Sequence, residues 1–491
     1  MPFGNLQFRK PEFRKISDVI WEIPTTFKKE MRVPARIYAT RKLLDEMDLQ
    51  VFDQVTNVAT LPGIINHAFC MPDGHSGYGF PIGGVAAFDT EKGIISPGGI
   101  GFDINCGMRL VLTNLTLRDV KPHLKELVDN LFERVPAGVG SKGFVKLNSQ
   151  QFREVVENGT KWCVENGYGW KEDLERTEEE GIMKDADSSK VSNRAVERGK
   201  TQVGTLGSGN HYLEIQHVKA ENIFDEHAAK VYGIFPDQIV IMFHCGSRGF
   251  GHQIGTDYLE KFLSIMDSKY KIKILDRELA CAPFSSPEGQ DYFTAMKCGI
   301  NMSFANRQVI LHRIREVFSK VFKTDAEKLG LKMLYDVAHN TAKLEKYKVD
   351  GEMKEVLVHR KGATRAFGPG HHEIPAIYRS VGQPVLIGGS METGSYLLAG
   401  TKGAEEQTWG STAHGSGRTM SRTRAKGMFR GDRLIQDMLK RGIYVKSASM
   451  SGVAEEAGPA YKDIHEVVET ASRAGISKKI VAFLPIGNVK G

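Results

Sequence analysis

Glycine is concentrated in five short stretches of this chain, and each stretch also holds side chains able to bind metal or phosphate. The stretches cover residues 71–84, 96–109, 204–214, 243–253 and 414–424. The chain has 52 glycines in 491 residues, against a usual share of about 7%. Glycine suits tight turns and close approach of backbone to a ligand, but it is also common in flexible linkers. No proline- or serine-rich linker is found, so these glycines are interpreted as ordered turns.

Between these stretches, the residue pattern predicts a mixture of helices and strands. Apolar side chains at helical spacing predict three helices, over 119–134, about 290–322 and about 464–474. Short apolar runs predict buried strands over 238–244, 332–339, 355–359 and 384–389. Because helices and strands are mixed throughout and no linker divides the chain, we expect one large mixed α+β domain over residues 1–491. Central β-sheets would be flanked by helices.

Two charged segments are interpreted as surface structure rather than as sites. The segment 171–200 is the most charged stretch and predicts a solvated helix and loop. Residues 348–351 read Lys-Val-Asp-Gly, which matches the core of ligases that use a lysine nucleophile. That motif continues with a basic residue two positions on, whereas here Glu352 and Met353 follow. The sequence therefore favours a surface turn at this place.

Nothing in the sequence indicates a membrane-spanning or secreted protein. No apolar run reaches the ~18 residues of a transmembrane helix, and the N-terminal stretch lacks the apolar core of a signal peptide. The six cysteines are scattered, which is typical of reduced thiols in the cytosol or the nucleus. The 66 basic and 59 acidic side chains give a net charge of +7, which permits a polyanionic partner without establishing one.

A carboxylate, a thiolate and three imidazoles form a candidate metal site. Asp103 and Cys106 are three residues apart in a glycine-flanked turn, so their side chains can converge on one region. His211, His244 and His339 each follow a strand-like segment or a glycine turn. Together these groups could hold one divalent ion, or two if the sulfur bridges. Thiolate and imidazole also suit Zn²⁺, and each histidine alone could instead be a hydrogen-bonded core residue.

His414 is a candidate of a different kind. It is followed by a glycine-containing loop and by Arg418, Arg422 and Arg424. A neutral imidazole can attack phosphorus to form a phosphoramidate. We expect backbone N–H groups of this loop to face phosphate oxygens and the arginines to neutralise charge. The alternative is a solvated basic loop.

These residues lie in motifs that resemble the RtcB family of RNA-splicing ligases. The motifs include GFDINCGMR at 101–109, LGSGNHYLE at 206–214, FHCGSRGFGHQ at 243–253 and HGSGR at 414–418. They occur in the family's order, and the resemblance spans nearly the whole chain. It implies a GTP- and Mn²⁺-dependent ligase that joins RNA 2′,3′-cyclic phosphate or 3′-phosphate ends to 5′-hydroxyl ends in tRNA splicing and RNA repair. The implied partners are cleaved tRNA halves or similar RNA, and accessory proteins of a tRNA ligase complex.

Carried over residue by residue, the resemblance implies a dinuclear manganese centre. Cys106 would bridge the two ions. Asp103 and His211 would complete one site, and His244 and His339 would complete the other. The family implication thus selects two Mn²⁺ ions where the residue chemistry alone left the metal open.

The resemblance also implies that His414 attacks the GTP α-phosphate and becomes guanylylated. The residues implied to hold the nucleotide are Asn210, Glu214, Asn340, Gly388, Gly389, Ser390, Met391, Ser395, Gly415, Ser416, Gly417, Tyr461 and Lys490. Those implied to contact RNA are Arg248, Arg418 and the basic side chains of 418–433 and 360–365. Asp73 is expected to support the opening of the cyclic phosphate.

Three positions depart from the family's pattern. Glu392 stands where a glycine is expected, so the nucleotide loop is expected to be altered or partly closed. Ser416 replaces a usual alanine, which is a mild change. Gly458-Pro459 stands where related sequences place the proline earlier, which loosens the assignment of Tyr461.

Two other functions remain open from the residues alone. A dinuclear metal phosphoesterase would trim RNA ends without joining them and would not need His414 or Lys490. A non-catalytic RNA-binding subunit would need neither the thiolate nor the imidazoles, so the intact ligand set argues against it.

Overall fold

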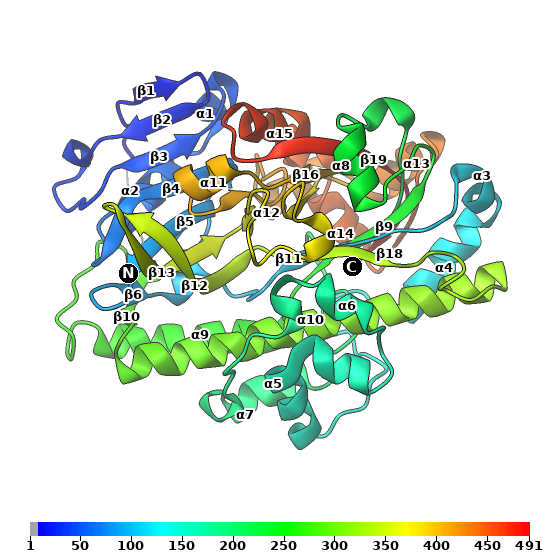
Figure 1. The fold of residues 1–491 in the computed structure, drawn as a ribbon, viewed down its shortest axis with the longest axis horizontal. Helices are drawn as coiled ribbons and strands as arrows, with labels where there is room; N and C mark the ends of the chain where they lie inside the picture. The colour runs from blue at the N-terminus through cyan, green and yellow to red at the C-terminus, as the bar shows by residue number, and fades with distance from the viewer. Residues whose placement is uncertain (1–7) are drawn as a thin grey trace.

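The computed structural model describes residues 8–491 and shows a mixed α+β fold, as the sequence predicts (Figure 1). One sheet has seven strands in the order β1-β2-β3-β4-β5-β13-β12, and a second has eight strands. The first comprises β1 (Arg14–Ser17), β2 (Ile20–Ile23), β3 (Ala35–Tyr38), β4 (Ile64–His75), β5 (Ile82–Asp89), β13 (Glu352–Lys361) and β12 (Asn340–Val349). The prediction of a single domain stays a prediction.

The second sheet follows the order β11-β7-β9-β8-β19-β16-β15, with β18 paired to β19. Its strands are β11 (Met333–Ala338), β7 (Gly107–Val111), β9 (Ile239–Cys245), β8 (Tyr212–His217), β19 (Lys478–Lys490), β16 (Ser395–Ala399), β15 (Pro384–Gly388) and β18 (Tyr444–Ser447). Two further pairs are β6 (Ile94–Ile95) with β10 (Ala282–Pro283), and β14 (Ala363–Arg365) with β17 (Ser411–Ala413). Within the described chain, only β3 with β4 and β18 with β19 pair in parallel.

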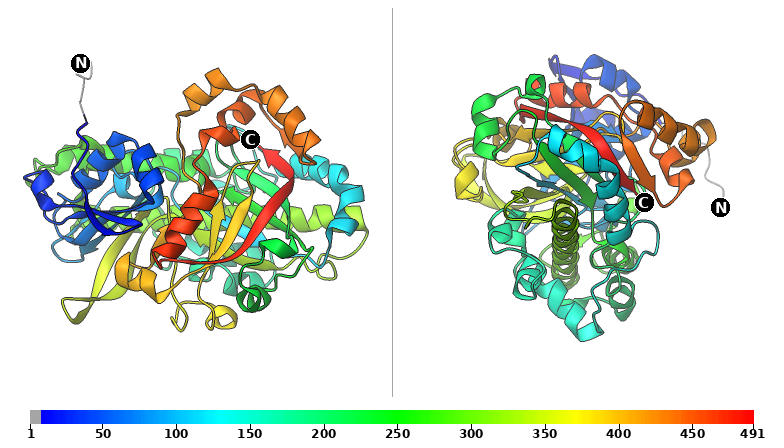
Figure 2. Two further views of the ribbon diagram at one scale, coloured as in Figure 1. Left: turned by 90° about the horizontal axis from the view of Figure 1, so that it is seen from above. Right: turned by 90° about the vertical axis from the view of Figure 1, so that its right-hand side faces the viewer.

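Helices surround the sheets (Figures 1 and 2). They are α1 (Arg41–Glu46), α2 (Leu49–Val58), α3 (Leu117–Val120), α4 (Leu124–Arg134), α5 (Ser149–Glu165), α6 (Glu172–Glu175), α7 (Asn193–Gly199), α8 (Glu226–Tyr232), α9 (Arg248–Ile265), α10 (Pro287–Phe322), α11 (Lys402–Gln407), α12 (Arg422–Met428), α13 (Gly431–Lys440), α14 (Met450–Glu455) and α15 (Ile464–Arg473). The helices α12, α13 and α14, orange in Figure 2, project from the body near the C-terminus.

Helix α10 is the longest helix in the described part of the chain. It has 36 residues, which corresponds to a length of about 54 Å. Ser286 caps its N-terminus through the Gly289 N–H, and Pro287 occupies the first turn, where a missing N–H costs nothing. In Figure 1 it crosses the molecule beneath the sheets, and it packs against α5 and α9. Its middle is buried, and this places its polar side chains in the interior.

The elements predicted from periodicity are confirmed. The four predicted strands are β9, β11, β13 and β15, and the long predicted helix is α10. The third predicted helix is α15, and Gly475 follows it with a φ of 74°, as a helix stop requires. The first predicted helix is divided into α3, a short 3₁₀ turn containing Pro122, and α4. Proline removes a helical N–H donor and so interrupts the regular ladder.

The Lys-Val-Asp-Gly run forms the predicted surface turn. Asp350 and Gly351 join β12 to β13 with φ values of 51° and 89°. Two consecutive positive φ angles are typical of a tight hairpin turn. Lys348 is exposed on β12.

The interpretation of 171–200 as a solvated segment is wrong for part of its length. Asp173 is only 2% exposed, and both of its oxygens accept hydrogen bonds of 2.7 Å from Arg315 of α10. Gln308 donates a further bond of 2.8 Å to Asp173. Glu178 is also buried. Buried cations need paired anions, and this charged segment supplies them to the interior.

All six cysteines are buried and carry free thiols. Across the described part of the chain, no helix combines the length and the apolar character needed to span a bilayer.

Replacing Asp173 tests whether this segment is part of the interior. Asp173→Ala leaves the Arg315 guanidinium buried without its anion, so we expect the free energy of unfolding to fall by about 3–5 kcal/mol. Denaturant unfolding measures the change. The control is Glu165→Gln, which breaks only the exposed Lys161–Glu165 pair and should change stability by no more than about 0.5 kcal/mol. Equal effects of the two substitutions would contradict the assignment.

Candidate metal and nucleotide site

Four neighbouring strands bring the predicted metal ligands to one edge of the eight-stranded sheet. In the order β11-β7-β9-β8, Met108 and Tyr212 both pair with His244, and Ala338 pairs with Gly107. Cys106 lies just before β7, His211 just before β8, His244 near the end of β9 and His339 just after β11. These four residues therefore lie at the same level along the strands. Neighbouring strands are about 4.8 Å apart, so side chains at this edge can meet across four strands.

The five predicted ligands do meet. Cys106 Sγ lies 3.1 Å from His244 Nε2 and 3.3 Å from His211 Nε2. His211 Nε2 is 3.0 Å from Asp103 Oδ2, and His244 Nε2 is 3.1 Å from His339 Nε2. Two groups result, Asp103–Cys106–His211 and Cys106–His244–His339, each with its ligand atoms within 4.8 Å of one another. The geometry is that of two adjacent cation sites that share one thiol.

Backbone carbonyls orient two of the imidazoles. The Nδ1–H of His211 donates to Leu206 O at 3.0 Å, and that of His244 donates to Asn210 O at 3.2 Å. Each bond leaves Nε2 as the free lone pair that points into the cluster. Such outer hydrogen bonds fix the tautomer and the ring orientation of metal-ligating histidines.

The charges of the cluster also suit a cation. Burial alone would raise the pKa of the Asp103 carboxyl, but the bond and charge of His211 outweigh it, and the pKa is lowered. Burial, and then neighbouring histidines, hold the pKa values of His244 and His339 well below the usual range. Burial, and then Asp103, raise the pKa of the Cys106 thiol well above its usual range. Neutral imidazoles and a thiol that needs a nearby cation to ionise are a fitting donor set for a divalent metal.

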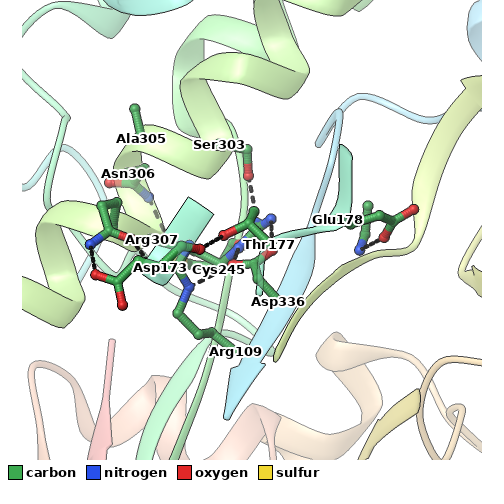
Figure 3. Close-up of polar contacts among 12 residues, drawn as sticks. Arg109, Asp173, Thr177, Glu178, Cys245, Ser303, Ala305, Asn306, Arg307 and Asp336 are labelled. Atoms are coloured by element: carbon green, nitrogen blue, oxygen red, sulfur yellow. Dashed lines mark hydrogen bonds and ion pairs between the residues drawn. The ribbon is translucent and has the colours of Figure 1, made fainter. Parts of the chain in front are cut away.

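A buried guanidinium on α10 holds the backbone around these ligands. Arg307 Nη1 donates to Asn105 O and to Cys245 O, each at 2.9 Å. Its Nε and Nη2 donate to Asp336, each at 2.8 Å, and Arg109 Nε donates to the same carboxylate at 2.7 Å. Figure 3 shows Arg307, Arg109 and Asp336 pointing toward one another. One side chain thus joins the turn of Cys106, the strand of His244 and the strand that leads to His339.

This network is not predicted from the sequence. Its signal is a run of polar side chains in the middle of an otherwise apolar buried helix, namely Asn301, Ser303, Asn306, Arg307 and Gln308. All of them are fully buried, which is rare for such residues unless they are paired.

A cavity of about 460 Å³ lies beside the ligand cluster, and His414 lines it. The ring of His414 is 4.7 Å from that of His339, measured between centroids. His414 Nδ1 lies 2.5 Å from Asp73 Oδ2, and Asp73 is fully buried. Burial would raise the pKa of Asp73, but His414 lowers it. Asp73 Oδ2 and His414 Nδ1 thus lie at ion-pair distance in the interior.

Most of the predicted nucleotide-binding residues line this cavity. They are Asn210, Gly388, Gly389, Ser390, Met391, Gly415, Ser416, Gly417, Tyr461 and Lys490. Glu214 and Ser395 lie outside the lining, where Gln216 Nε2 donates to Glu214 at 2.7 Å and to Ser395 at 3.1 Å. Burial raises the pKa of Glu214 to about 7.

Asn340 is also absent from the cavity lining. Its side chain donates to Asp103 O at 3.0 Å and accepts the Gly362 N–H at 2.8 Å. In this structure it therefore supports the metal-ligand turn.

The expectation that loop amides next to His414 face phosphate is wrong for three of them. The N–H groups of His414 and Gly415 donate to Asp73 Oδ2 at 3.0 and 3.2 Å. The N–H of Ser416 donates to Gly388 O at 3.0 Å. These amides shape the loop because Asp73 and the neighbouring strand end accept their bonds.

The expected RNA surface at 360–365 is also wrong. Arg360, Lys361 and Arg365 are each at most 5% exposed. Arg360 pairs with Glu345, and Arg365 pairs with Glu178, Glu179 and Glu373. Lys361 donates to backbone carbonyls. The charges of Arg360 and Arg365 are thus neutralised inside the protein, and Lys361 is buried against carbonyl groups.

The cations of the basic segment 418–433 are largely exposed, although Arg422, Lys426 and Arg430 form ion pairs with neighbouring carboxylates. The exposed cations of this segment are Arg422, Arg424, Lys426, Arg430 and Arg433. Arg418 lines the cavity, and its Nη1 lies 3.2 Å from both Glu456 Oε1 and the Tyr461 hydroxyl. Glu456 also lines the cavity, and the sequence does not predict it as a site residue. Arg248 lies at the metal edge instead, with Nη1 3.4 Å from His211 Nδ1.

The comparisons with known proteins agree in family. Residues 54–491 match the family model described as tRNA-splicing ligase RtcB. The tRNA-splicing ligase RtcB of Thermococcus kodakarensis is 53% identical over 479 residues, covering 97% of this chain and 98% of that protein. Proteins of the same name from Methanococcus maripaludis and Archaeoglobus fulgidus are 53% and 52% identical, over 98% and 97% of this chain and 100% and 98% of their own lengths.

The shared thiol predicts how many Mn²⁺ ions each variant binds. We expect the unaltered protein to bind two Mn²⁺ ions, His339→Ala to keep one tight site, and Cys106→Ala to lose tight binding at both, because only Cys106 belongs to both groups. Titration calorimetry with Mn²⁺ alone measures this. Cys163→Ser, a buried thiol whose one bond is to Ala305 O, is the matched control. Two tight ions in Cys106→Ala would overturn the shared ligand.

Arg307→Lys tests the backbone support. A lysine cannot bond Asp336 in bidentate fashion and also reach the two carbonyls, so we expect Mn²⁺ affinity to fall by about 10- to 100-fold and the thermal midpoint to drop. Arg313→Lys on the same helix, where the side chain pairs with Glu316, should leave Mn²⁺ affinity unchanged. Unaltered Mn²⁺ binding in Arg307→Lys would show that the network serves stability alone.

Proposed function

The chain belongs to the RtcB family, and from this membership we propose that it is a GTP- and Mn²⁺-dependent RNA ligase. It would join RNA ends bearing a 2′,3′-cyclic phosphate or 3′-phosphate to 5′-hydroxyl ends. The relatives are named tRNA-splicing ligases, so cleaved tRNA halves are the proposed substrate, with damaged RNA of the same end chemistry as a second. The observation that carries the proposal is one cavity lined both by His414 and by His244, a member of the shared-thiol cluster.

Two manganese ions are assigned to the ligand cluster. Asp103 and His211 would hold one, His244 and His339 the other, and the Cys106 thiolate would bridge them. When bound, the ions neutralise the triphosphate and polarise its α-phosphorus. Zinc binds such ligands more tightly by intrinsic affinity; the family membership is what favours manganese.

The chain itself supplies the nucleophile. Asp73 Oδ2 lies beside Nδ1 of His414, so Nε2 is the nitrogen proposed to attack the α-phosphorus of GTP. The bond to the bridging oxygen breaks, pyrophosphate leaves, and a phosphoramidate joins His414 to GMP. A 3′-phosphate of RNA then displaces the imidazole and takes the GMP. The 5′-hydroxyl attacks the activated RNA phosphate, and GMP departs. A cyclic phosphate is first opened by water to a 3′-phosphate.

The cavity suggests how the nucleotide would lie. The α-phosphate would lie beside His414 and the ligand cluster, and Tyr461, Lys490 and Glu456 line the same cavity. Burial lowers the pKa of Lys490, although Glu456 and Glu214 oppose the shift. A desolvated lysine between two carboxylates suits recognition of the guanine edge, while Tyr461 offers a ring for stacking.

RNA would follow the exposed cations of 418–433, and its binding should weaken as salt rises. Arg248, beside the ligand cluster, is proposed to contact the RNA phosphate near the reacting ends. We also propose that the protein acts in the cytosol or the nucleus with accessory proteins.

Covalent labelling tests the proposed nucleophile. With α-labelled GTP and Mn²⁺, we expect an acid-labile label on the unaltered protein and none on His414→Ala. Lys348→Ala is the control, because Lys348 is the rival nucleophile of the Lys-Val-Asp-Gly turn and should label normally. Protein that stays unlabelled, or His414→Ala that labels equally, would refute the mechanism. In that case, RNA with a 2′,3′-cyclic phosphate that is only hydrolysed would identify the alternative, a dinuclear phosphoesterase.

A further inference from the structure

Two loops form walls of the nucleotide cavity, and the carboxylate of Glu392 connects these two loops. Ser390 and Met391 line the cavity from the loop 388–394, and Glu456 and Tyr461 line it from the turn 456–461. Glu392 is absent from the lining, so the expected narrowing of the cavity by its side chain is not seen.

The Glu392 side chain reaches across to the second wall instead. Its Oε1 accepts the Gly458 N–H at 2.9 Å, and its Oε2 accepts Arg441 Nη2 at 2.6 Å. Gly458 belongs to the turn 456–461, and Arg441 follows directly on α13. We infer that Glu392 is a positioning residue for the nucleotide, because its two contacts hold the two walls of the cavity in place before GTP binds. The contacts of Glu392 with Gly458 and Arg441 are called the clasp. This inference rests on the proposed function.

Gly458 is adapted to this contact. A Cβ atom at position 458 would lie 2.8 Å from Glu392 Oε1 and 3.1 Å from Glu392 Cδ, which is closer than side chains pack. A proline there would lack the N–H that Glu392 accepts. Glu392 and Gly458-Pro459 are two of the three departures noted in the sequence, and the structure places them in direct contact. The two departures are therefore complementary parts of one feature.

Apolar contacts also anchor the loop 388–394 to α13, β18 and α14. Met391 packs in a small cluster with Met438 of α13, Val445 of β18 and Val453 of α14. Within the loop, Ser390 Oγ accepts the N–H groups of Glu392 and Thr393, each at 3.2 Å. The loop is thus stiff in itself, and Glu392 supplies its polar link to the other wall.

The two contacts of the clasp differ in strength. Arg441 is 47% exposed, so its ion pair is screened and contributes little. The Glu392 carboxylate is 18% exposed, and its bond to the Gly458 N–H is charge-assisted and partly shielded from water. Most of the effect should therefore come from Gly458. A pre-formed pocket binds more tightly because less ordering remains to be done.

The test compares variants for GTP binding and for wall mobility. We expect Glu392→Gly to raise the Kd and the KM for GTP about tenfold, with the labelling rate at saturating GTP unchanged. Arg441→Gln should raise the Kd about twofold. In the absence of GTP, amide hydrogen exchange of the peptide covering 456–461 should become faster in Glu392→Gly. Asp437→Asn, which breaks only the exposed Lys440–Asp437 pair on α13, is the matched control.

The outcomes separate the clasp from the proposed function. An unchanged Kd together with unchanged exchange in Glu392→Gly would overturn the clasp. A fall in labelling rate at saturating GTP without a change in KM would assign Glu392 to the chemical step and would also overturn it. If the unaltered protein binds no GTP with Mn²⁺, the proposed function fails. The exchange of 456–461 then still decides whether Glu392 holds the two walls together.

Discussion

The bidentate pairing of Arg307 with Asp336 is the interaction on which the candidate site depends. The pair is fully buried, so neither charge is tolerable without the other. The remaining donors of Arg307 are aimed at the carbonyls of Asn105 and Cys245, which adjoin two of the metal ligands. Asp336 lies three residues before His339 on the same strand run. One helix therefore sets the relative positions of three ligand-bearing segments, and packing of α10 becomes a condition for the cluster.

A second constraint divides the site into a rigid and an adaptable part. The ligand cluster is built on adjacent strands of one sheet, where the register fixes the level of each side chain. The nucleotide cavity is instead bounded by loops that other side chains hold, Asp73 for His414 and Glu392 for the wall at Gly458. This division suits the proposed reaction, in which the metals would stay in place while nucleotide and RNA enter and leave. Gly388, Gly415 and Gly417 lie where these loops and strand ends approach one another.

Local sequence patterns predict secondary-structure elements and the residues of short motifs. Periodicity located α10, α15 and four buried strands, and the motifs located His414 and the five ligands that the structure brings together. Pairings between distant residues could not be read in this way. Arg307 reaches Asn105 across 202 positions, and His414 bonds Asp73 across 341. The same limit explains the errors: Asp173 and Arg360 were assigned to the surface from their charge, but partners elsewhere in the chain neutralise them inside.

A crystal structure with Mn²⁺ and GTP, recorded at a wavelength where manganese scatters anomalously, tests the shared-thiol site directly. We predict two anomalous peaks, both in contact with Cys106 Sγ, one beside Asp103 and His211 and one beside His244 and His339. We also predict phosphorus bonded to His414 Nε2, with Asp73 on Nδ1. Peaks elsewhere, a single peak away from Cys106, or a nucleotide bound far from His414 would contradict these predictions.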